Sequence, residues 1–328
     1  MVLALIPPPA APGFLAAHGW GGAEILPLAG DASFRRYFRV VGAEGTAVLM
    51  DAPPEHEDVR PFLRIADALA ERGFASPRIL ARDLVAGLLL IEDLGDDRMA
   101  EIVAAAPERE EPVYAAAIDL LLALHAAPAP DDLTPYDRAV YQREAALFPE
   151  WYAPAVGLTV DAVGYRAAWD AVLDRLPDPD PAVLVLRDYH AENIMLCGPG
   201  GESLALLDFQ DALAGHPAYD LVSLLQDARR DVAPALEAAM LARYRAVQPL
   251  DDAAYAILGA QRNAKILGIF TRLWKRDGKP KYLSLQPRVW TYLMRDLDHP
   301  ALAPVAAWFD ANVPEVARAD HWRSGAAL

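Results

Sequence analysis

The sequence predicts an α+β protein with a β-rich N-terminal lobe and a mostly helical C-terminal lobe. Residues 24–94 hold short runs of β-branched and aromatic residues between turns that contain Gly and Pro. From residue 113 onward, long segments carry apolar residues at helical spacing. Strands followed by helices are typical of the α+β class. The 328 residues suffice for two packed lobes, which we place at residues 1–94 and 95–328.

The N-terminal lobe is predicted to be a small antiparallel sheet with one inserted helix. A short helix is expected over residues 13–22. A hairpin follows, whose second strand is Thr46–Met50 after a turn at Gly42–Gly45. Residues 57–72 place apolar side chains at helical spacing and end before a Gly, which predicts a helix. Two further strands are expected on either side of a turn at Val85–Gly87.

The C-terminal lobe is predicted to be helical, with one small hairpin inside it. Residues 113–127 are apolar on most faces, which indicates a buried central helix. Residues 181–210 then change pattern: an apolar run, a polar loop and a short strand are followed by a turn at 197–201 and another strand. Long helices resume afterwards and include residues 252–276.

The composition restricts the partners and the compartment. The formal net charge of −16 repels nucleic acid and anionic membranes. The single cysteine, Cys197, excludes a disulfide within the chain and makes a Cys-based zinc site implausible. Pro7–Pro9 interrupt the apolar N-terminus, which has no basic n-region, and no apolar run reaches the ~18 residues that span a bilayer. We expect a cytoplasmic protein with no obligate protein partner.

Two acidic motifs flank the turn at 197–201. Asp188 is followed five residues later by Asn193, and Asp208 ends the next strand. Phosphoryl transfer from ATP needs a carboxylate that orients the attacking hydroxyl, and oxygen ligands that hold Mg²⁺ against the phosphates. These three residues supply that set. The alternative is that Asp188 and Asn193 are ordinary turn residues and that Asp208 only ends a strand.

These motifs resemble the aminoglycoside phosphotransferase and choline kinase branch of the kinase superfamily. The resemblance implies a two-lobed, protein-kinase-like fold that uses ATP and Mg²⁺. It also implies that Asp188 is the catalytic Asp and that Asn193 and Asp208 are metal ligands. His190 would support the catalytic loop, and Asp220, in the first long helix after the metal ligand, would hold that loop in place.

The resemblance also assigns nucleotide-binding segments in the N-terminal lobe. The segment Ile91–Leu94 resembles the linker whose backbone binds adenine, which points to Glu92, Asp93 and Leu94. Kinases carry a phosphate-binding Lys on the strand that corresponds to Thr46–Met50, but this chain has no Lys before residue 265. We therefore expect arginines to supply the charge. The alternative is an exposed basic edge strand. The nucleotide-covering loop contributes these residues: Ser33, Phe34, Arg35 and Arg36.

Four segments narrow the resemblance to bacterial sugar kinases of cell-wall recycling, over about Leu26 to Tyr292. These enzymes phosphorylate the anomeric (1-) hydroxyl of N-acetylmuramate and N-acetylglucosamine, so the resemblance implies an amino sugar substrate and a role in peptidoglycan recycling. The segments are Gly-Asp-Ala-Ser-Phe-Arg-Arg-Tyr-Phe-Arg-Val (30–40), Val-Leu-Met-Asp-Ala-Pro-Pro (48–54), Leu-Phe-Pro-Glu-Trp-Tyr (147–152) and Gln-Arg-Asn-Ala-Lys-Ile-Leu-Gly-Ile-Phe (261–270).

Two segments are candidates for the acceptor site. Residues 142–152 combine carboxylates with aromatic rings, a combination that binds sugars, and Glu144 and Glu150 are the candidates there. For Phe148 we expect a buried position at a helix end instead. On the helix 252–276, the cations Arg262, Lys265 and Arg272 share one face. That face suits a phosphate or the lactyl carboxylate of N-acetylmuramate, and a solvated basic face explains it equally well.

Two other functions stay open at this point. One is a kinase for a different small hydroxyl compound, such as an aminoglycoside or choline, since an acidic pocket suits those cations. The other is a nucleotide-binding pseudokinase that acts as a scaffold, which the missing Lys suggests. The intact set Asp188, Asn193 and Asp208 argues against a pseudokinase, because an inactive site has no need of metal ligands.

Overall fold

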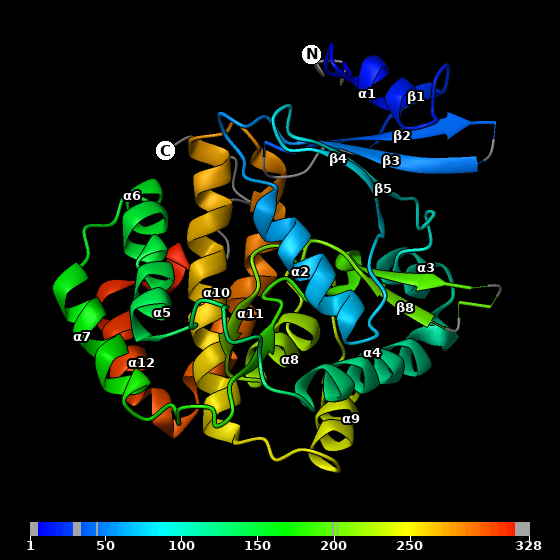
Figure 1. The fold of residues 1–328 in the computed structure, drawn as a ribbon. Helices are drawn as coiled ribbons and strands as arrows, with labels where there is room; N and C mark the ends of the chain where they lie inside the picture. The colour runs from blue at the N-terminus through cyan, green and yellow to red at the C-terminus, as the bar shows by residue number, and fades with distance from the viewer. Residues whose placement is uncertain (1–5, 29–33, 44, 199, 202, 319–328) are drawn as a thin grey trace. The chain divides into compact units, whose positions relative to one another are not determined.

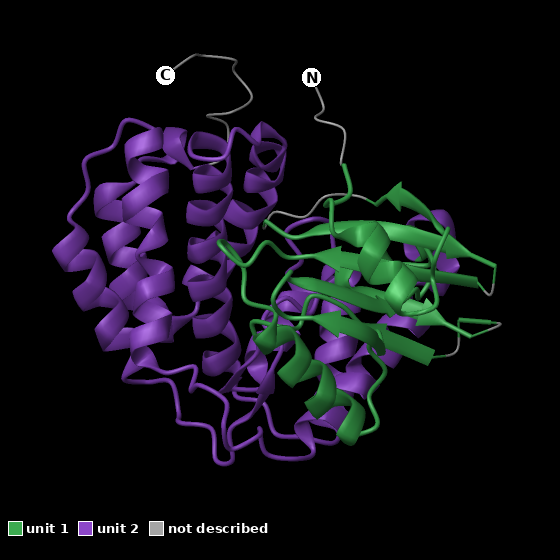
Figure 2. Ribbon diagram, turned by 45° about the horizontal axis from the view of Figure 1, so that its top comes forward, with its two compact units in different colours: residues 1–102, 192–211 green, residues 103–191, 212–328 purple. Residues whose placement is uncertain are grey.

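The computed structural model describes residues 6–28, 34–43, 45–198, 200–201 and 203–318. The chain forms two compact units, shown in Figure 2. The first unit consists of residues 1–102 and 192–211, and the second of residues 103–191 and 212–328. The segment 192–211 therefore belongs with the N-terminal part of the chain, although helical segments precede it in the sequence.

The first unit is built on a five-stranded antiparallel sheet, as the sequence predicts. The strand order is β1-β2-β3-β5-β4, with every neighbouring pair antiparallel. Alternate side chains of the strands, such as Phe38 and Val40, join Phe14 of helix α1 in one apolar cluster. The elements are α1 (Ala11–Ala17), β1 (Glu24–Pro27), β2 (Arg36–Gly42), β3 (Gly45–Asp51), α2 (Arg60–Glu71), β4 (Ile79–Asp83) and β5 (Leu88–Glu92).

The first helix is shorter than the predicted span 13–22. Helix α1 ends at Ala17 because Gly19 adopts a left-handed conformation, with φ of 86°. The N–H of Trp20 then donates to the carbonyl of Leu15 at 2.8 Å. This bond closes the helix end in the Schellman arrangement, for which glycine is the favoured residue.

A second, two-stranded sheet completes the first unit. Strands β7 (Ile194–Cys197) and β8 (Ser203–Leu206) form the predicted hairpin. Both strands bond to the N-terminal segment: Leu196 N–H donates to the Asp97 carbonyl at 2.8 Å, and Leu206 N–H donates to the Ala75 carbonyl at 2.9 Å. Phe209 stacks on Phe62 of helix α2, with ring centroids 4.8 Å apart. These contacts explain why the hairpin belongs to the first unit.

The second unit is mainly helical and is organised around α10 (Figure 1). Its helices are α4 (Glu110–His125), α5 (Arg138–Ala145), α6 (Ala153–Ala155), α7 (Ala162–Leu173), α8 (Ala218–Leu225), α9 (Pro234–Arg245), α10 (Asp252–Lys275), α11 (Gln286–Leu297) and α12 (Ala303–Asn312), while α3 (Met99–Ala105) links the units. The expected helices at 113–127 and 252–276 thus correspond to α4 and α10. A short sheet of β6 (Val183–Val185) and β9 (Leu213–Gly215) is an addition that the sequence did not reveal.

Helix α10 is buried along most of its length, and its neighbours approach closely. A Cβ at Gly268 would lie 2.4 Å from the carbonyl of Leu147, so only glycine fits there. Within the described part of the chain, no helix has the length and apolarity needed to cross a membrane.

Candidate active site

The β7–β8 hairpin places Asn193 and Asp208 at its open end, in the first unit. Asn193 immediately precedes β7, and Asp208 lies two residues after β8. Ile194 pairs with Leu206, and Leu207 N–H donates to the carbonyl of Asn193 at 2.9 Å. The two candidate metal ligands therefore flank one end of a rigid ladder. Asp208 itself has a left-handed backbone, with φ of 55°, which is uncommon for a residue other than glycine.

The chemistry of this pair fits Mg²⁺. A carboxylate and an amide oxygen are hard donors, and Mg²⁺ in phosphotransferases is held by one or two carboxylates together with substrate phosphates and waters. Asp208 is partly exposed, with 30% of its side chain accessible. Its Oδ1 accepts a hydrogen bond from Gln210 Nε2 at 2.9 Å and from Arg35 Nη2 at 3.1 Å.

The loop that carries Asp188 is fixed by helix α8 of the second unit. Asp220 is fully buried and accepts hydrogen bonds from Leu186 N–H at 2.7 Å and Arg187 N–H at 2.8 Å. Ser223 Oγ donates to the carbonyl of Arg187 at 3.1 Å. Within the loop, the N–H of His190 donates to the carbonyl of Asp188 at 3.0 Å. The backbone on both sides of the Arg187 peptide is therefore set by α8.

Asp227 is a third residue that bonds the backbone of this loop, and it lies just beyond the end of α8. Its Oδ2 accepts from Ala191 N–H at 3.4 Å, and its Oδ1 accepts from Arg229 N–H at 2.8 Å. The sequence analysis missed Ser223 and Asp227. For Ser223 the spacing from Asp220 was the available signal, because residues three apart lie on one face of a helix. Asp227 follows the helix, so no helical spacing marked it.

Burial controls the charge state of these groups. Desolvation raises the pKa of Asp220 to about 7, although the Leu186 and Arg187 N–H groups oppose the shift. Burial likewise raises the pKa of Asp227. Burial holds the pKa of His190 well below its ordinary value, and the nearby cations Arg229 and Arg262 lower it further. His190 is therefore a neutral imidazole two residues after Asp188 in the chain.

Glu144 is the centre of a buried charged cluster in the second unit. Its carboxylate accepts hydrogen bonds from Tyr136 and Arg187 and forms an ion pair with Lys265 Nζ at 3.1 Å. Lys265 Nζ also donates to Tyr219 Oη at 3.1 Å. Burial alone would raise the pKa of Glu144, but Lys265 and Arg187 bring that pKa below its ordinary value. The cluster ties α5 and α10 to the residue that precedes Asp188.

The solvated-face interpretation of α10 is wrong for two of its three cations. Arg262 and Lys265 are 3% and 9% exposed, and Arg262 Nη2 donates to Ser223 Oγ at 2.8 Å. Arg272 is half-buried. A helical wheel gives the direction of a side chain but not the element that packs against it, so burial of this face was not visible in the sequence.

The segment around Glu150 divides into buried rings and an exposed carboxylate. Phe148 and Tyr152, in the short helical segment η2 (Phe148–Tyr152), are fully buried. Phe148 stacks on Tyr152 at 5.0 Å and meets Trp290 edge-on at 5.7 Å, which confirms its expected buried position. Glu150 is exposed.

The candidate nucleotide-binding arginines lie at the start of β2. Ser33 lies outside the described residues. Phe34 is exposed, and its ring stacks on His56 at 4.7 Å. Arg36 pairs with Asp51, with Nε 2.7 Å from Oδ2. Met50, near the position where related kinases carry a Lys, is fully buried in the sheet.

The candidate adenine-binding segment follows β5. Glu92 N–H donates to the carbonyl of Arg78 at 2.9 Å, and the Glu92 carboxylate pairs with the Arg78 guanidinium at 3.0 Å. Asp93 pairs with Arg39 at 2.7 Å and accepts a hydrogen bond from Gly95 N–H at 3.0 Å. Leu94 is partly exposed. The side chains of Glu92 and Asp93 are thus engaged in ion pairs within the first unit.

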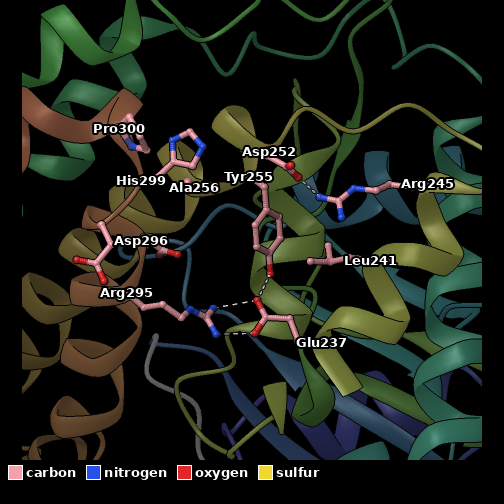
Figure 3. Close-up of a pocket in the computed structure, with 11 residues that line it drawn as sticks. Glu237, Leu241, Arg245, Asp252, Tyr255, Ala256, Arg295, Asp296, His299 and Pro300 are labelled. Atoms are coloured by element: carbon pink, nitrogen blue, oxygen red, sulfur yellow. Dashed lines mark hydrogen bonds and ion pairs between the residues drawn. The ribbon is translucent and has the colours of Figure 1, made fainter. Parts of the chain in front are cut away.

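A surface hollow of about 490 Å³ lies elsewhere in the second unit (Figure 3). Glu237 is held there by Tyr255 Oη at 2.8 Å and by Arg295, whose Nη1 and Nη2 lie 2.6 and 2.9 Å from its carboxylate. A further ion pair joins Arg245 to Asp252 at the opposite side. None of the predicted site residues lines this hollow.

Comparison with solved structures shows the fold. A choline/ethanolamine kinase family protein from Mesorhizobium loti superimposes with a TM-score of 0.61 at 16% identity, covering 93% of this chain and 97% of that one. A choline kinase from Streptococcus pneumoniae gives a TM-score of 0.59 at 14% identity, covering 85% and 93%. The chain therefore has the two-lobed α+β fold of protein-kinase-like phosphotransferases, as the sequence predicts.

Comparison with sequences shows the family. A protein from Caulobacter vibrioides named N-acetylmuramate/N-acetylglucosamine kinase is 40% identical, over 92% of this chain and 95% of the relative. A Pseudomonas aeruginosa protein of the same name is also 40% identical, over 86% and 87%. The family model described as "Phosphotransferase enzyme family" matches residues 24–258. This protein is therefore an enzyme that belongs to the phosphotransferase enzyme family.

Proposed function

We propose that the protein transfers the γ-phosphoryl group of ATP to the anomeric hydroxyl of N-acetylmuramate, N-acetylglucosamine or both, in peptidoglycan recycling. The observation that carries this proposal is the 40% identity, over nearly the full length of both chains, to a relative named for these two sugars. We keep residues 1–94 as the nucleotide-binding lobe and residues 95–328 as the lobe with the catalytic loop and acceptor site.

Asp188 is the proposed catalytic residue. Its carboxylate accepts a hydrogen bond from the acceptor hydroxyl and orients that oxygen toward the γ-phosphorus. As the new O–P bond forms and the bond to the ADP oxygen breaks, Asp188 takes the hydroxyl proton. Asn193 and Asp208 are the proposed ligands of Mg²⁺, which supplies positive charge to the phosphate oxygens when bound. The products are a sugar 1-phosphate and ADP.

Catalysis of this kind depends on positioning, so the supports of the Asp188 loop matter. Asp220 and Ser223 fix the peptide groups on both sides of Arg187, and Asp227 holds the loop near Ala191. His190, two residues after Asp188, is buried and neutral, so it supports the loop without adding charge. We propose that α8 holds Asp188 in the geometry that an in-line transfer requires.

The four acceptor candidates divide into two kinds. Glu144, Arg262 and Lys265 are buried and bonded to other protein groups, which favours a role in shaping the wall of the acceptor site. Glu150 is exposed, which favours direct hydrogen bonds to sugar hydroxyls. Nearer the N-terminus, the proposed contacts of the phosphate end of ATP are Ser33, Phe34, Arg35 and Arg36, and those of adenine are Glu92, Asp93 and Leu94.

A substrate panel tests the proposal. The purified protein is incubated with ATP and Mg²⁺ and with N-acetylmuramate, N-acetylglucosamine, choline or an aminoglycoside, and the product is followed by ³¹P NMR. We expect a phosphate on the anomeric carbon of one or both amino sugars. Phosphorylation of choline or the aminoglycoside alone would favour a different small-molecule kinase, and ATP binding without turnover on any acceptor would favour a pseudokinase.

A further inference from the structure

The proposed metal ligand Asp208 is paired with a cation of the same unit. Arg35 Nη2 lies 3.1 Å from Asp208 Oδ1, although the two residues are 173 positions apart. The Arg35 side chain is only 8% exposed. Gln210 Nε2 donates to the same oxygen at 2.9 Å. One oxygen of the carboxylate that is expected to bind a metal thus carries two donors, one of them positively charged.

Both members of this pair are held by regular structure. Arg35 immediately precedes β2, whose first residue, Arg36, is in register with Asp51 of β3. Asp208 follows β8, and its neighbour Phe209 is stacked on Phe62 of α2. The backbone positions of Arg35 and Asp208 are therefore fixed by neighbouring elements of the first unit.

A guanidinium and Mg²⁺ compete for the same carboxylate oxygen. Mg²⁺ binds its ligands at about 2.0–2.1 Å and tolerates little departure from octahedral geometry, and two cations on one oxygen repel each other. Nucleotide phosphates change this balance, because they offer a guanidinium a bidentate partner of higher negative charge. Arg35 then gains a new counter-ion at the moment when Asp208 gains the metal.

We propose that Arg35 exchanges partners on substrate binding, from the Asp208 carboxylate to the phosphate oxygens of the nucleotide. The proposal rests on the proposed function, since it assumes that Asp208 is a metal ligand. It makes Arg35 the residue that couples the binding of the metal to that of the nucleotide. Mg²⁺ alone binds weakly to the empty protein, and nucleotide and metal each strengthen the binding of the other by the same factor.

Arg39, which lies in β2 four residues after Arg35, provides a matched control. Its Nε lies 2.7 Å from Asp93 Oδ2, and its Nη2 lies 2.9 Å from Asp96 Oδ1. Replacement of Arg39 by Gln also removes one guanidinium charge from the first unit, and it leaves the ion pair of Arg35 with Asp208 in place. Any general effect of lowering the positive charge of the first unit therefore appears in both variants.

The experiment measures Mn²⁺ binding by electron paramagnetic resonance, with and without ADP, in the full-length protein. Arg35→Gln is expected to tighten Mn²⁺ binding to the nucleotide-free protein, to weaken ADP binding, and to reduce a coupling factor that we expect to be roughly 5- to 150-fold in the parent. Arg39→Gln should keep the parent coupling. Arg35→Lys should keep part of it, because the charge is retained and the bidentate geometry is lost.

Asp208→Asn distinguishes a failure of the proposed partner exchange from a failure of the proposed metal site. If Asp208→Asn lowers Mn²⁺ affinity while Arg35→Gln leaves Mn²⁺ affinity and the coupling unchanged, the exchange is refuted and the metal site stands. If Asp208→Asn binds Mn²⁺ as the parent does, the metal assignment in the proposed function is wrong, and the exchange falls with it. Thermal melting of each variant shows that the comparison is made between folded proteins.

Discussion

Left-handed backbone conformations mark two residues of the candidate active site. Among the residues that the structure describes, Arg187 and Asp208 are the non-glycine residues with positive φ, at 71° and 55°. Such a conformation costs roughly 1–3 kcal/mol and persists where the surrounding structure enforces it, often at functional sites. Arg187 immediately precedes the proposed catalytic residue, and Asp208 is a proposed metal ligand. The strain supports the assignment of both segments to the active site.

The residue-scale prediction concerns Asp188. Asp188→Asn keeps the size of the side chain but removes the carboxylate that orients the hydroxyl and accepts its proton. We expect kcat to fall by roughly 10²–10⁴-fold, with nucleotide affinity close to that of the parent, because the nucleotide is held by other groups. Steady-state kinetics and ADP titration measure both quantities. Near-parent turnover in a folded Asp188→Asn protein would rule out the proposed catalytic role.

At the scale of elements, α8 supports the loop that carries Asp188, the proposed catalytic residue. Asp220 and Ser223 lie on one face of this helix, Asp227 follows the helix end, and each of the three bonds the backbone of the loop. Arg262 of α10 donates to Ser223 and so links the long central helix to the same face. A buried carboxylate that accepts backbone N–H groups fixes the conformation of a loop. Any conformation that breaks one of these hydrogen bonds leaves a buried polar group unsatisfied, which costs free energy.

The element-scale prediction tests Asp227 as a positioning residue. Asp227→Leu removes the acceptor for the Ala191 and Arg229 N–H groups and is expected to lower kcat by about 10- to 100-fold, since a small misplacement of a reacting group is costly. KM for ATP should change little. Asp227→Asn retains one carbonyl oxygen that can accept one of these two N–H groups, so its loss of kcat should be smaller than that of Asp227→Leu. Equal losses in the two variants, or a loss confined to KM, would contradict a positioning role.

At the scale of the whole molecule, the candidate residues are distributed over both compact units. Asp188 and its supports belong to the second unit, whereas Asn193, Asp208 and Arg35 belong to the first. The hairpin β7–β8 is bonded on both strands to the N-terminal segment. The chain therefore passes from one unit to the other within the proposed catalytic motif Asp188–Asn193, between Ala191 and Glu192.

The prediction at this scale concerns stability and pH. The pKa of Asp220 is about 7 in the folded protein, against ~3.9 for an unperturbed Asp. Between these values the folded state binds the extra proton, so Asp220 makes stability fall as pH rises from about 4 to about 7, by up to about 1.36 kcal/mol per pH unit. Asp220→Asn should remove this contribution and flatten the dependence.

Urea unfolding of the parent and of Asp220→Asn across this pH range measures the effect. Asp220 is a protonated carboxyl group in the folded protein at pH 4. Asp220→Asn should be less stable than the parent at this pH, because the amide NH2 is a donor and would face one of the two backbone N–H groups, of Leu186 and Arg187, that the Asp220 oxygens accept. The difference between the two proteins should shrink toward pH 7. A constant difference across the range would show that Asp220 does not titrate with a raised pKa.

Local sequence patterns determined the fold class and the chemical motifs. The antiparallel sheet with its inserted helix, the long helix α10 and the β7–β8 hairpin all follow from apolar periodicity and turn residues, which are encoded within a few neighbouring positions. The spacing from Asp188 to Asn193, and the place of Asp208 after a strand, also lie within one short segment. The same motifs indicated the family that the comparisons show.

Only the tertiary structure decided which charges meet. Arg35 and Asp208 are 173 positions apart, and Glu144 is 121 positions from Lys265, its partner in an ion pair. The burial of Arg262, the contact of Asp227 with Ala191 and the pairing of β9 with β6 likewise depend on segments far apart in the chain. Periodicity gives each side chain a direction along its own element. What faces that side chain depends on the packing of the other elements, which no local pattern specifies.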